Sequence, residues 1–405
     1  MNKKNILIKN NIQSYNLNNK LLKKFSKNFQ KIIIDINNDI KNTKKTLNVL
    51  DEKFKMNFKL KNLSKFKNFK TIAVIGMGGS ILGSAAINSF LKTKIKKKLY
   101  FFDDINVEKI INFKKNKNAD KTLFIIISKS GNTVETLSNL LSLNIIKKKS
   151  KNIIIISEKK NNILFTISKK FDLFFIEHKD HIGGRYSVLS AVGVLPAYLM
   201  GVNIFKLRKN LKKYLKNKEK FFLKDSTIKL SNLLTKNKYQ SLIFLNYAPE
   251  LEKFLYWCQQ LIAESLGKKG KGFLPVISNA PKDHHSLLQL YLEGPRNKLF
   301  TIFSLDKNVK KKIDSKKVSS RLSFLHKKSQ DEIKIAQKNA LIKTLLKNKI
   351  PFREFKINSS TEETLGELFS YFILETVIIG KLLKINPFDQ PAVEQVKIFT
   401  KKLLS

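Results

Sequence analysis

Short apolar runs alternate with stretches of helical periodicity along most of the chain beyond residue 70. Near-continuous hydrophobic runs of this length are typical of parallel strands that helices cover on both faces. The first series comprises Thr71–Ile75, Leu99–Phe102, Thr122–Ile127, Asn152–Ile156 and Leu173–Ile176. The second comprises Tyr239–Leu245, Phe273–Ile277, Leu299–Phe303 and Phe352–Ile357. The pattern therefore predicts two α/β domains, each built on a doubly wound parallel sheet.

The two ends of the chain have a different pattern. Residues 1–66 show amphipathic helices between Asn-rich breaks, with no β-branched run long enough to predict a strand. After Thr361, two helices are expected over Glu362–Leu383 and Pro391–Leu403, the latter with Pro391 in its first turn. We therefore predict a helical N-terminal segment (1–66), two domains (67–205 and 206–360) and a C-terminal helical arm (361–405).

The composition is strongly basic, yet its details do not favour a nucleic-acid surface. The 405 residues include 79 Lys and Arg against 31 Asp and Glu, a net charge of +48. Only five of the basic residues are arginine, the residue that dedicated nucleic-acid surfaces prefer, so 79 − 5 = 74 are lysines spread over the chain. We interpret them as solvated helix faces and expect no specific nucleic-acid partner. The single cysteine, Cys258, excludes an internal disulfide and a Cys-based zinc cluster.

The sequence favours a cytoplasmic protein without a membrane segment. The first 30 residues are rich in Lys and Asn and do not resemble a secretory signal. The stretch Tyr186–Phe205 is uncharged and almost long enough to span a bilayer, but its Ser, Gly and Pro residues lower its hydropathy. We expect a buried helix here.

The first strand leads into a glycine-rich turn, Gly76–Gly83, directly before a helix. Glycines in such a turn let backbone amides approach a ligand. Two nucleotide-binding patterns fit imperfectly, because a dinucleotide fingerprint would need glycine at Ile81 and a Walker loop would need lysine at Ser84. Asp103 and Asp104 end the second strand where a ribose-binding acid could lie, so a dehydrogenase remains an alternative.

A second loop, Ser128–Thr136, joins the third strand to the next helix. Its hydroxyls and free amides could surround a phosphate at the positive end of the helix, and Gly131 permits a tight backbone. An ordinary helix cap with Glu135 in the first turn is the alternative. The whole loop resembles the signature of the sugar-isomerase (SIS) domain, whose members bind phosphosugars.

Further segments resemble one family in the same order along residues 71–400. They are Gly183–Ser187, Gln260–Glu264 with the following Ser265–Lys268, Asp283–Gln289, and Phe388–Gln390 with Lys397 seven residues later. Together with the two loops, these segments resemble the glucose-6-phosphate isomerase family. The resemblance implies two SIS-type domains and reversible interconversion of glucose 6-phosphate and fructose 6-phosphate through a cis-enediolate, a step of glycolysis and gluconeogenesis, without cofactor or metal.

The family resemblance also implies catalytic roles. Glu264 would be the base, with Gln260 one helical turn earlier on the same face. Arg185, beside Gly184, would stabilise the enediolate as a fixed cation. His285 would open the sugar ring with Glu135 as its partner carboxylate, and a register shift to the neighbouring His284 remains open.

The remaining assignments concern binding. The resemblance places the phosphate at Ser128, Lys129, Ser130 and Thr133, and the sugar near Gly79 and Ser80. Lys397 would act at the ring or carbonyl oxygen, with Gln390 orienting it. The other histidines, His178, His181 and His326, have no clustered ligands around them and are expected to be structural, as are Trp257 and Cys258.

In this family the histidine reaches the active site of a neighbouring subunit, so the resemblance implies a homodimer. Two other functions remain open: an isomerase that also accepts mannose 6-phosphate, and a phosphosugar-binding SIS regulator without turnover. The sequence shows no helix-turn-helix with an arginine-bearing recognition helix that would support a DNA-binding regulator.

Overall fold

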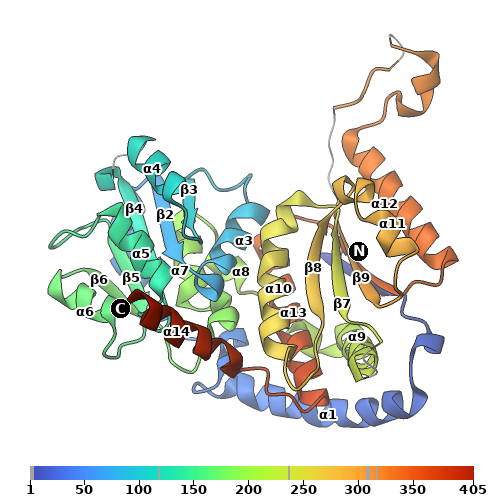
Figure 1. The fold of residues 1–405 in the computed structure, drawn as a ribbon, viewed down its shortest axis with the longest axis horizontal. Coiled ribbons are helices and arrows are strands. Elements are labelled where there is room, and N and C mark those ends of the chain that lie inside the picture. The colour runs from blue at the N-terminus through green and yellow to red at the C-terminus, as the bar shows by residue number, and fades with distance from the viewer. Residues whose placement is uncertain (1–3, 117–118, 236–237, 307–310, 316–317) are drawn as a thin grey trace.

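Two five-stranded sheets, each flanked by helices, make up a computed structural model that describes residues 4–116, 119–235, 238–306, 311–315 and 318–405 (Figure 1). The first sheet has the order β3-β2-β4-β5-β6, and all its strands are parallel. These strands are β2 (Thr71–Gly76), β3 (Lys98–Phe102), β4 (Thr122–Ile127), β5 (Ile153–Ser157) and β6 (Phe174–Glu177). The predicted strands of this domain are confirmed, with ends within one residue.

The crossover helices explain why these runs are apolar on both faces. They are α3 (Leu82–Phe90), α4 (Val107–Asn116), α5 (Val134–Leu143) and α6 (Ile163–Lys170). All six residues of β4 and all five of β5 are buried, as expected for central strands of a covered sheet.

The second sheet has the order β1-β10-β9-β7-β8. Its strands are β7 (Ser241–Asn246), β8 (Leu274–Asn279), β9 (Lys298–Leu305), β10 (Phe352–Ile357) and β1 (Ile6–Asn10). The prediction of an entirely helical N-terminal segment is wrong, because β1 pairs antiparallel with β10 at the sheet edge. Its alternation places Ile6 and Ile8 in the core, but two such positions are too few to distinguish a strand in the sequence alone.

The helix expected to begin a C-terminal arm instead belongs to the core. In α13 (Glu362–Leu382), 19 of the 21 residues are buried. It contacts α1 (Asn19–Lys41), α9 (Asn217–Thr235) and α10 (Glu252–Leu266), the helix that also contacts α3 of the first domain. Of the predicted arm, the exposed part is the C-terminal stretch from Pro391 that contains α14 (Glu394–Leu404, dark red in Figure 1), where Thr400 alone is half-buried.

The uncharged stretch Tyr186–Phe205 contains the buried helix α7 (Ala191–Met200), which Ser190 caps and Gly201 ends in the left-handed conformation. None of the helices among the described residues is both long and apolar enough to cross a bilayer.

The remaining α-helices are α2 (Leu60–Leu63), α8 (Ile204–Leu207), α11 (Leu288–Leu292) and α12 (Gln330–Lys347). Short 3-10 helices include η1 (Ser14–Asn16), η2 (Thr46–Leu50), η3 (Ser64–Phe66), η4 (Gly78–Ser80), η5 (Ala119–Lys121), η6 (Gly184–Leu189), η7 (Lys213–Leu215), η8 (Pro249–Leu251), η9 (Lys282–His285), η10 (Ser320–Leu325) and η11 (Pro391–Val393).

Candidate active site

The order of the strands determines where each sheet can hold a ligand. In the first sheet the chain leaves β2 toward β3 and leaves β4 toward β5, in opposite directions. The loops after β2 and β4 therefore diverge and leave a crevice at the carboxyl ends of these strands, the usual ligand position in open α/β sheets. The two loops are the glycine turn with η4 and the segment Ser128–Thr133, so the fold brings together the two motifs singled out in the sequence.

The glycine turn lies directly against the turn that carries Arg185. A Cβ atom at Gly79 would stand 2.2 Å from the carbonyl carbon of Gly184 and 2.6 Å from the backbone nitrogen of Arg185. Gly78 has a φ of +51°, and a Cβ there would lie 2.7 Å from the side-chain nitrogen of Gln260 on α10. The glycines therefore permit a close approach of three segments that are far apart in sequence.

The Arg185 side chain is fully enclosed where these segments meet, with only 1% of the residue exposed. Its Nε donates to Ser265 Oγ at 2.8 Å, and its Nη2 donates to the carbonyl oxygens of Pro387 and Asp389 at 2.7 and 3.0 Å. Its Nη1 donates to Gln390 Oε1. A buried guanidinium needs such partners because an unpaired buried charge costs several kcal/mol.

The fifth N–H of this guanidinium faces the predicted base. Arg185 Nη1 lies 3.3 Å from Glu264 Oε2, the longest of its contacts. The other carboxylate oxygen, Glu264 Oε1, accepts from Gln260 Nε2 at 2.9 Å. The Glu264 side chain is 30% exposed, whereas that of Arg185 is closed off, so the carboxylate lies at the open side of the pair.

Several neighbours of Arg185 had no role assigned to them from the sequence. Ser265 Oγ bonds both Arg185 Nε and the Tyr186 hydroxyl, the latter at 2.8 Å. Tyr186 also donates to the Pro387 carbonyl, and burial raises the pKa of its phenol. Trp257 Nε1 donates to the Arg185 carbonyl at 3.1 Å. Ser265 lies within the segment Ser265–Lys268, which resembles the family. That resemblance is the feature of the sequence that could have indicated a role for Ser265.

The hydroxyl-rich loop is closed by its own hydrogen bonds. Ser128 Oγ and Thr133 Oγ1 are 2.8 Å apart, and Ser130 Oγ lies 3.5 Å from the same Thr133 oxygen. The backbone N–H of Gly131, which has a φ of +67°, donates to Ser128 Oγ at 3.2 Å. Thr133 is the N-cap of α5 without a side-chain capping bond, so its hydroxyl is turned into the loop. Three hydroxyls thus converge at the positive end of α5.

Lys129 points away from these hydroxyls toward an adjoining turn. Its ammonium donates to the Asp180 carbonyl at 2.7 Å and lies 3.8 Å from Glu158. Burial lowers the pKa of Lys129, while Glu158 and Asp180 act in the opposite direction. Its nearby charge adds to the positive potential around the loop.

Comparisons with known proteins show the family to which the chain belongs. Residues 25–272 match the family described as Phosphoglucose isomerase. The chain is 31% identical over 358 residues to the glucose-6-phosphate isomerase of Methanocaldococcus jannaschii, covering 83% of this chain and 85% of that protein. The chain belongs to the phosphoglucose isomerase family. It is also 33% identical to a probable glucose-6-phosphate isomerase of Methanococcus maripaludis, covering 87% of this chain and 82% of the relative.

Solved structures support the fold of this phosphoglucose isomerase family member. A hypothetical protein of Thermus thermophilus superposes with a TM-score of 0.82 over 98% of this chain and 100% of its own, at 22% identity. A glucose-6-phosphate isomerase of Chlamydia trachomatis gives a TM-score of 0.69 over 84% of this chain and 71% of its own, at 18% identity. The α/β class with two sheet domains is therefore confirmed.

Not every residue that the family resemblance implied lies at the Arg185 cluster. His285 is exposed on η9, after β8 of the second domain, and within the described chain it forms no hydrogen bond or ion pair with Glu264, Arg185 or Glu135. The neighbouring His284 is half-buried, with Nε2 2.8 Å from the Tyr247 hydroxyl. The pKa of His284 is lowered by its burial and by the proximity of His285.

Lys397 also lies away from the cluster. It is on the exposed helix α14, where its partner among the described residues is Glu394, at 2.6 Å. The lysine that does support the cluster is Lys268, whose ammonium bonds the Asp389 carboxylate and carbonyl at 2.6 Å each. Because Asp389 O accepts from Arg185, Lys268 helps to hold the segment that encloses the guanidinium.

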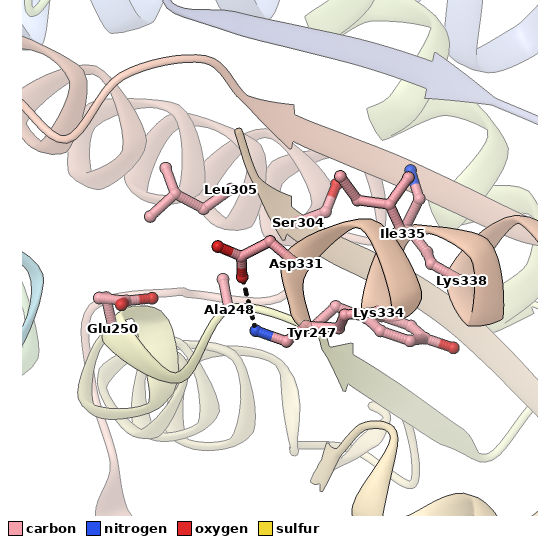
Figure 2. A pocket seen from close by; sticks show the side chains of 9 residues that line it. All are labelled: Tyr247, Ala248, Glu250, Ser304, Leu305, Asp331, Lys334, Ile335 and Lys338. Carbon is pink, nitrogen blue, oxygen red and sulfur yellow. Dashed lines mark hydrogen bonds and ion pairs between the residues drawn. The ribbon is translucent and has the colours of Figure 1, made fainter. Parts of the chain in front are cut away.

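The second sheet has a crevice of its own, which contains none of the predicted site residues. The chain leaves β7 and β9 in opposite directions, and a pocket lies at their carboxyl ends beside the start of α12 (Figure 2). Both of its lysines are already paired, Lys334 with Asp331 at 3.3 Å and Lys338 with Glu354 on β10.

We predict that Gly79→Ala destabilises the protein and abolishes activity, because backbone atoms of Gly184 and Arg185 occupy the space of the new methyl group. Thermal or urea unfolding should show a loss of at least about 2 kcal/mol. Gly184→Ala is the matched control, since a Cβ at Gly184 meets nothing within 4 Å. Equal stability of the two variants would contradict the close packing described here.

Proposed function

We propose that this protein interconverts glucose 6-phosphate and fructose 6-phosphate, as the names of its relatives state for those proteins. The observation that carries the proposal is the position of Glu264, a partly open carboxylate 3.3 Å from a fully enclosed arginine. Both groups border the crevice that holds the hydroxyl-rich loop of Ser128 and Thr133. A base, an oxyanion-stabilising cation and a phosphate cradle are what this reaction requires.

Glu264 acts as the general base on the open-chain sugar. Its carboxylate takes the proton from C2, the electron pair of that bond forms the C1–C2 double bond, and the O1 oxygen becomes the enediolate oxygen. Return of the proton to C1, with the O2 hydrogen released and O1 protonated, gives the ketose. Gln260, hydrogen bonded to Oε1, leaves Oε2 as the oxygen that faces Arg185 and the substrate.

Arg185 stabilises the negative charge that develops on the substrate oxygens. Four of its five N–H groups are held by Ser265, Pro387, Asp389 and Gln390. The fifth makes only the 3.3 Å contact with Glu264, and it is the donor that can turn to an enediolate oxygen when the carboxylate takes up a proton. A guanidinium fixed in this way is preorganised and stays protonated throughout.

The phosphate group binds at the loop between β4 and α5. Ser128, Ser130 and Thr133 exchange their mutual hydrogen bonds for bonds to phosphate oxygens at the positive end of α5, and Lys129 adds a nearby charge. Gly79 and Ser80 place backbone atoms beside the sugar. Ser80 is 9% exposed and follows Gly79 in η4, at the carboxyl end of β2.

The proposed active unit is a homodimer in which the partner subunit's His285 completes the site. Opening the sugar ring needs a proton donor at the ring oxygen, and the cluster around Arg185 contains no histidine among its described neighbours. His285 is exposed on η9, where a second subunit could receive it, with Glu135 as its carboxylate partner. Lys397 lies on the exposed α14 and would exchange its ion pair with Glu394 for a substrate oxygen.

Replacing Glu264 by Gln should remove proton transfer but keep phosphosugar binding. We expect exchange of the C2 hydrogen with deuterated water to fall by at least about a thousandfold, because the amide cannot accept the proton. Nuclear magnetic resonance of glucose 6-phosphate in deuterated water measures the exchange at C2, and calorimetry measures the binding. Exchange at the wild-type rate would show that another residue is the base.

Mixed dimers test the sharing of the site. Glu264→Gln and His285→Ala subunits are each expected to be inactive as pure proteins. When they are refolded together, half of the dimers combine both variants, and each of these has one intact site. Activity should therefore recover to about a quarter of wild type. If His285 acts within its own subunit, no intact site forms and the mixture stays inactive.

A further inference from the structure

A second hollow lies at the amino ends of the strands of the second sheet, across the sheet from the pocket in Figure 2. Here the strands meet the N-terminal segment. The cavity volume of the hollow is about 290 Å³, near the lower end of the size range of small-molecule sites. Four segments supply most of its lining: η1 and the residues around the starts of β7, β9 and β10. The Glu264 cluster, in contrast, borders the carboxyl ends of the strands of the first sheet, so this hollow is a separate place in the fold.

The charged side chains that line this hollow are all cations. They are Lys238, Arg296, Lys298 and Lys349, and none of the described residues that line the hollow is acidic. Lys298 bonds only the Pro295 carbonyl and the Asn297 side-chain oxygen, both uncharged acceptors. None of the four forms an ion pair with a described carboxylate, in contrast to Lys334 and Lys338 of the pocket in Figure 2. The uncompensated charge attracts an anion.

Asn16, one of the residues that line the hollow, has a buried donor without an acceptor in the described part of the chain. Asn16 is 6% exposed, and its Oδ1 accepts from the Tyr239 hydroxyl at 2.9 Å. That bond fixes the amide so that Nδ2 faces the other way, and this nitrogen is buried without a partner among the described residues. Leaving a buried donor unsatisfied costs about 1–3 kcal/mol, so an oxygen acceptor from a ligand would relieve the cost.

The hollow also has an aromatic surface at its mouth. Tyr15 is 60% exposed, and its hydroxyl donates to the Lys349 carbonyl at 3.3 Å, which ties the ring to the rim. Tyr239 and Tyr291, which also line the hollow, are buried. An exposed ring held at one end offers a face on which a flat heterocycle can stack.

We propose that this hollow is a binding site for a nucleoside polyphosphate. The phosphates would lie between Arg296 and Lys298, and the base would stack on Tyr15. Asn16 Nδ2 would gain an oxygen acceptor only if binding of the ligand uncovers it. The arginine matters most among the cations, because its planar fork binds phosphate in two-point contacts that a lysine cannot make. The inference is independent of the isomerase chemistry.

Calorimetric titration of the full chain with ADP tests the site, with saturating fructose 6-phosphate present to fill the catalytic crevice. We expect saturable binding of one ADP per chain, weakened at least tenfold by Arg296→Ala/Lys298→Ala and unchanged by Lys114→Ala/Lys115→Ala. The control pair removes the same charge from exposed positions on α4 of the first domain. The Arg296/Lys298 variant should retain wild-type isomerase turnover without ADP, which shows that it is folded.

Tyr15→Ala separates the base from the phosphates. This substitution should weaken the affinity for ADP at least fivefold. The affinity for inorganic pyrophosphate, the probe without a base, should be unchanged. Equal affinity of the wild-type protein for ADP and pyrophosphate would overturn the nucleoside assignment. Three outcomes would overturn the site itself. They are an equal loss of ADP affinity in the Lys114/Lys115 control variant, loss of ADP binding when fructose 6-phosphate is added, and ADP binding that does not saturate.

Discussion

The enclosure of one guanidinium, that of Arg185, is the interaction on which the candidate site depends. Its five N–H groups reach a serine on α10, two carbonyls and a glutamine of the segment before α14, and the carboxylate of Glu264. The charge is stable inside the protein only because these acceptors converge on it. The same bonds hold the turn of Arg185, α10 and the C-terminal segment in one geometry. Stability and preorganised chemistry therefore have a common origin here.

The glycine turn and the order of the strands bring the rest of the site to this cation. Gly79 lets the turn after β2 approach the Arg185 turn more closely than any side chain would allow. The reversal of chain direction between β2 and β4 opens the neighbouring crevice for the hydroxyl loop. Because α10 contacts α3, the helix that carries Glu264 joins the second domain to the first. A phosphosugar in this position would be held at both ends, by the phosphate loop and by the arginine.

What the sequence could predict depended on how local each signal was. The central strand β4 could be located to the residue, since burial on both faces leaves an unbroken apolar run. Strand β10 was located as well, although Arg353, Glu354 and Lys356 interrupt its apolar positions. The edge strand β1 could not, because only Ile6 and Ile8 mark its buried face and its partner β10 is remote in the sequence. The place of α13 in the core depends on α1, α9 and α10, which are distant in the sequence, so the sequence predicted the helix but not its packing partners. Arg185 and Glu264 were recognisable by motif, whereas the support from Lys268 and Tyr186 became visible only in the tertiary structure.

A crystal structure of the protein with bound fructose 6-phosphate is the most direct test of the account. We predict that the phosphate lies among the hydroxyls of Ser128, Ser130 and Thr133, and that the C1 and C2 oxygens lie within hydrogen-bond distance of Arg185 Nη1. Glu264 Oε2 should then face the C1 hydrogen that the reaction transfers to C2. A sugar bound elsewhere, or bound here with its phosphate toward Arg185 and its carbonyl end away from Glu264, would contradict the proposed chemistry.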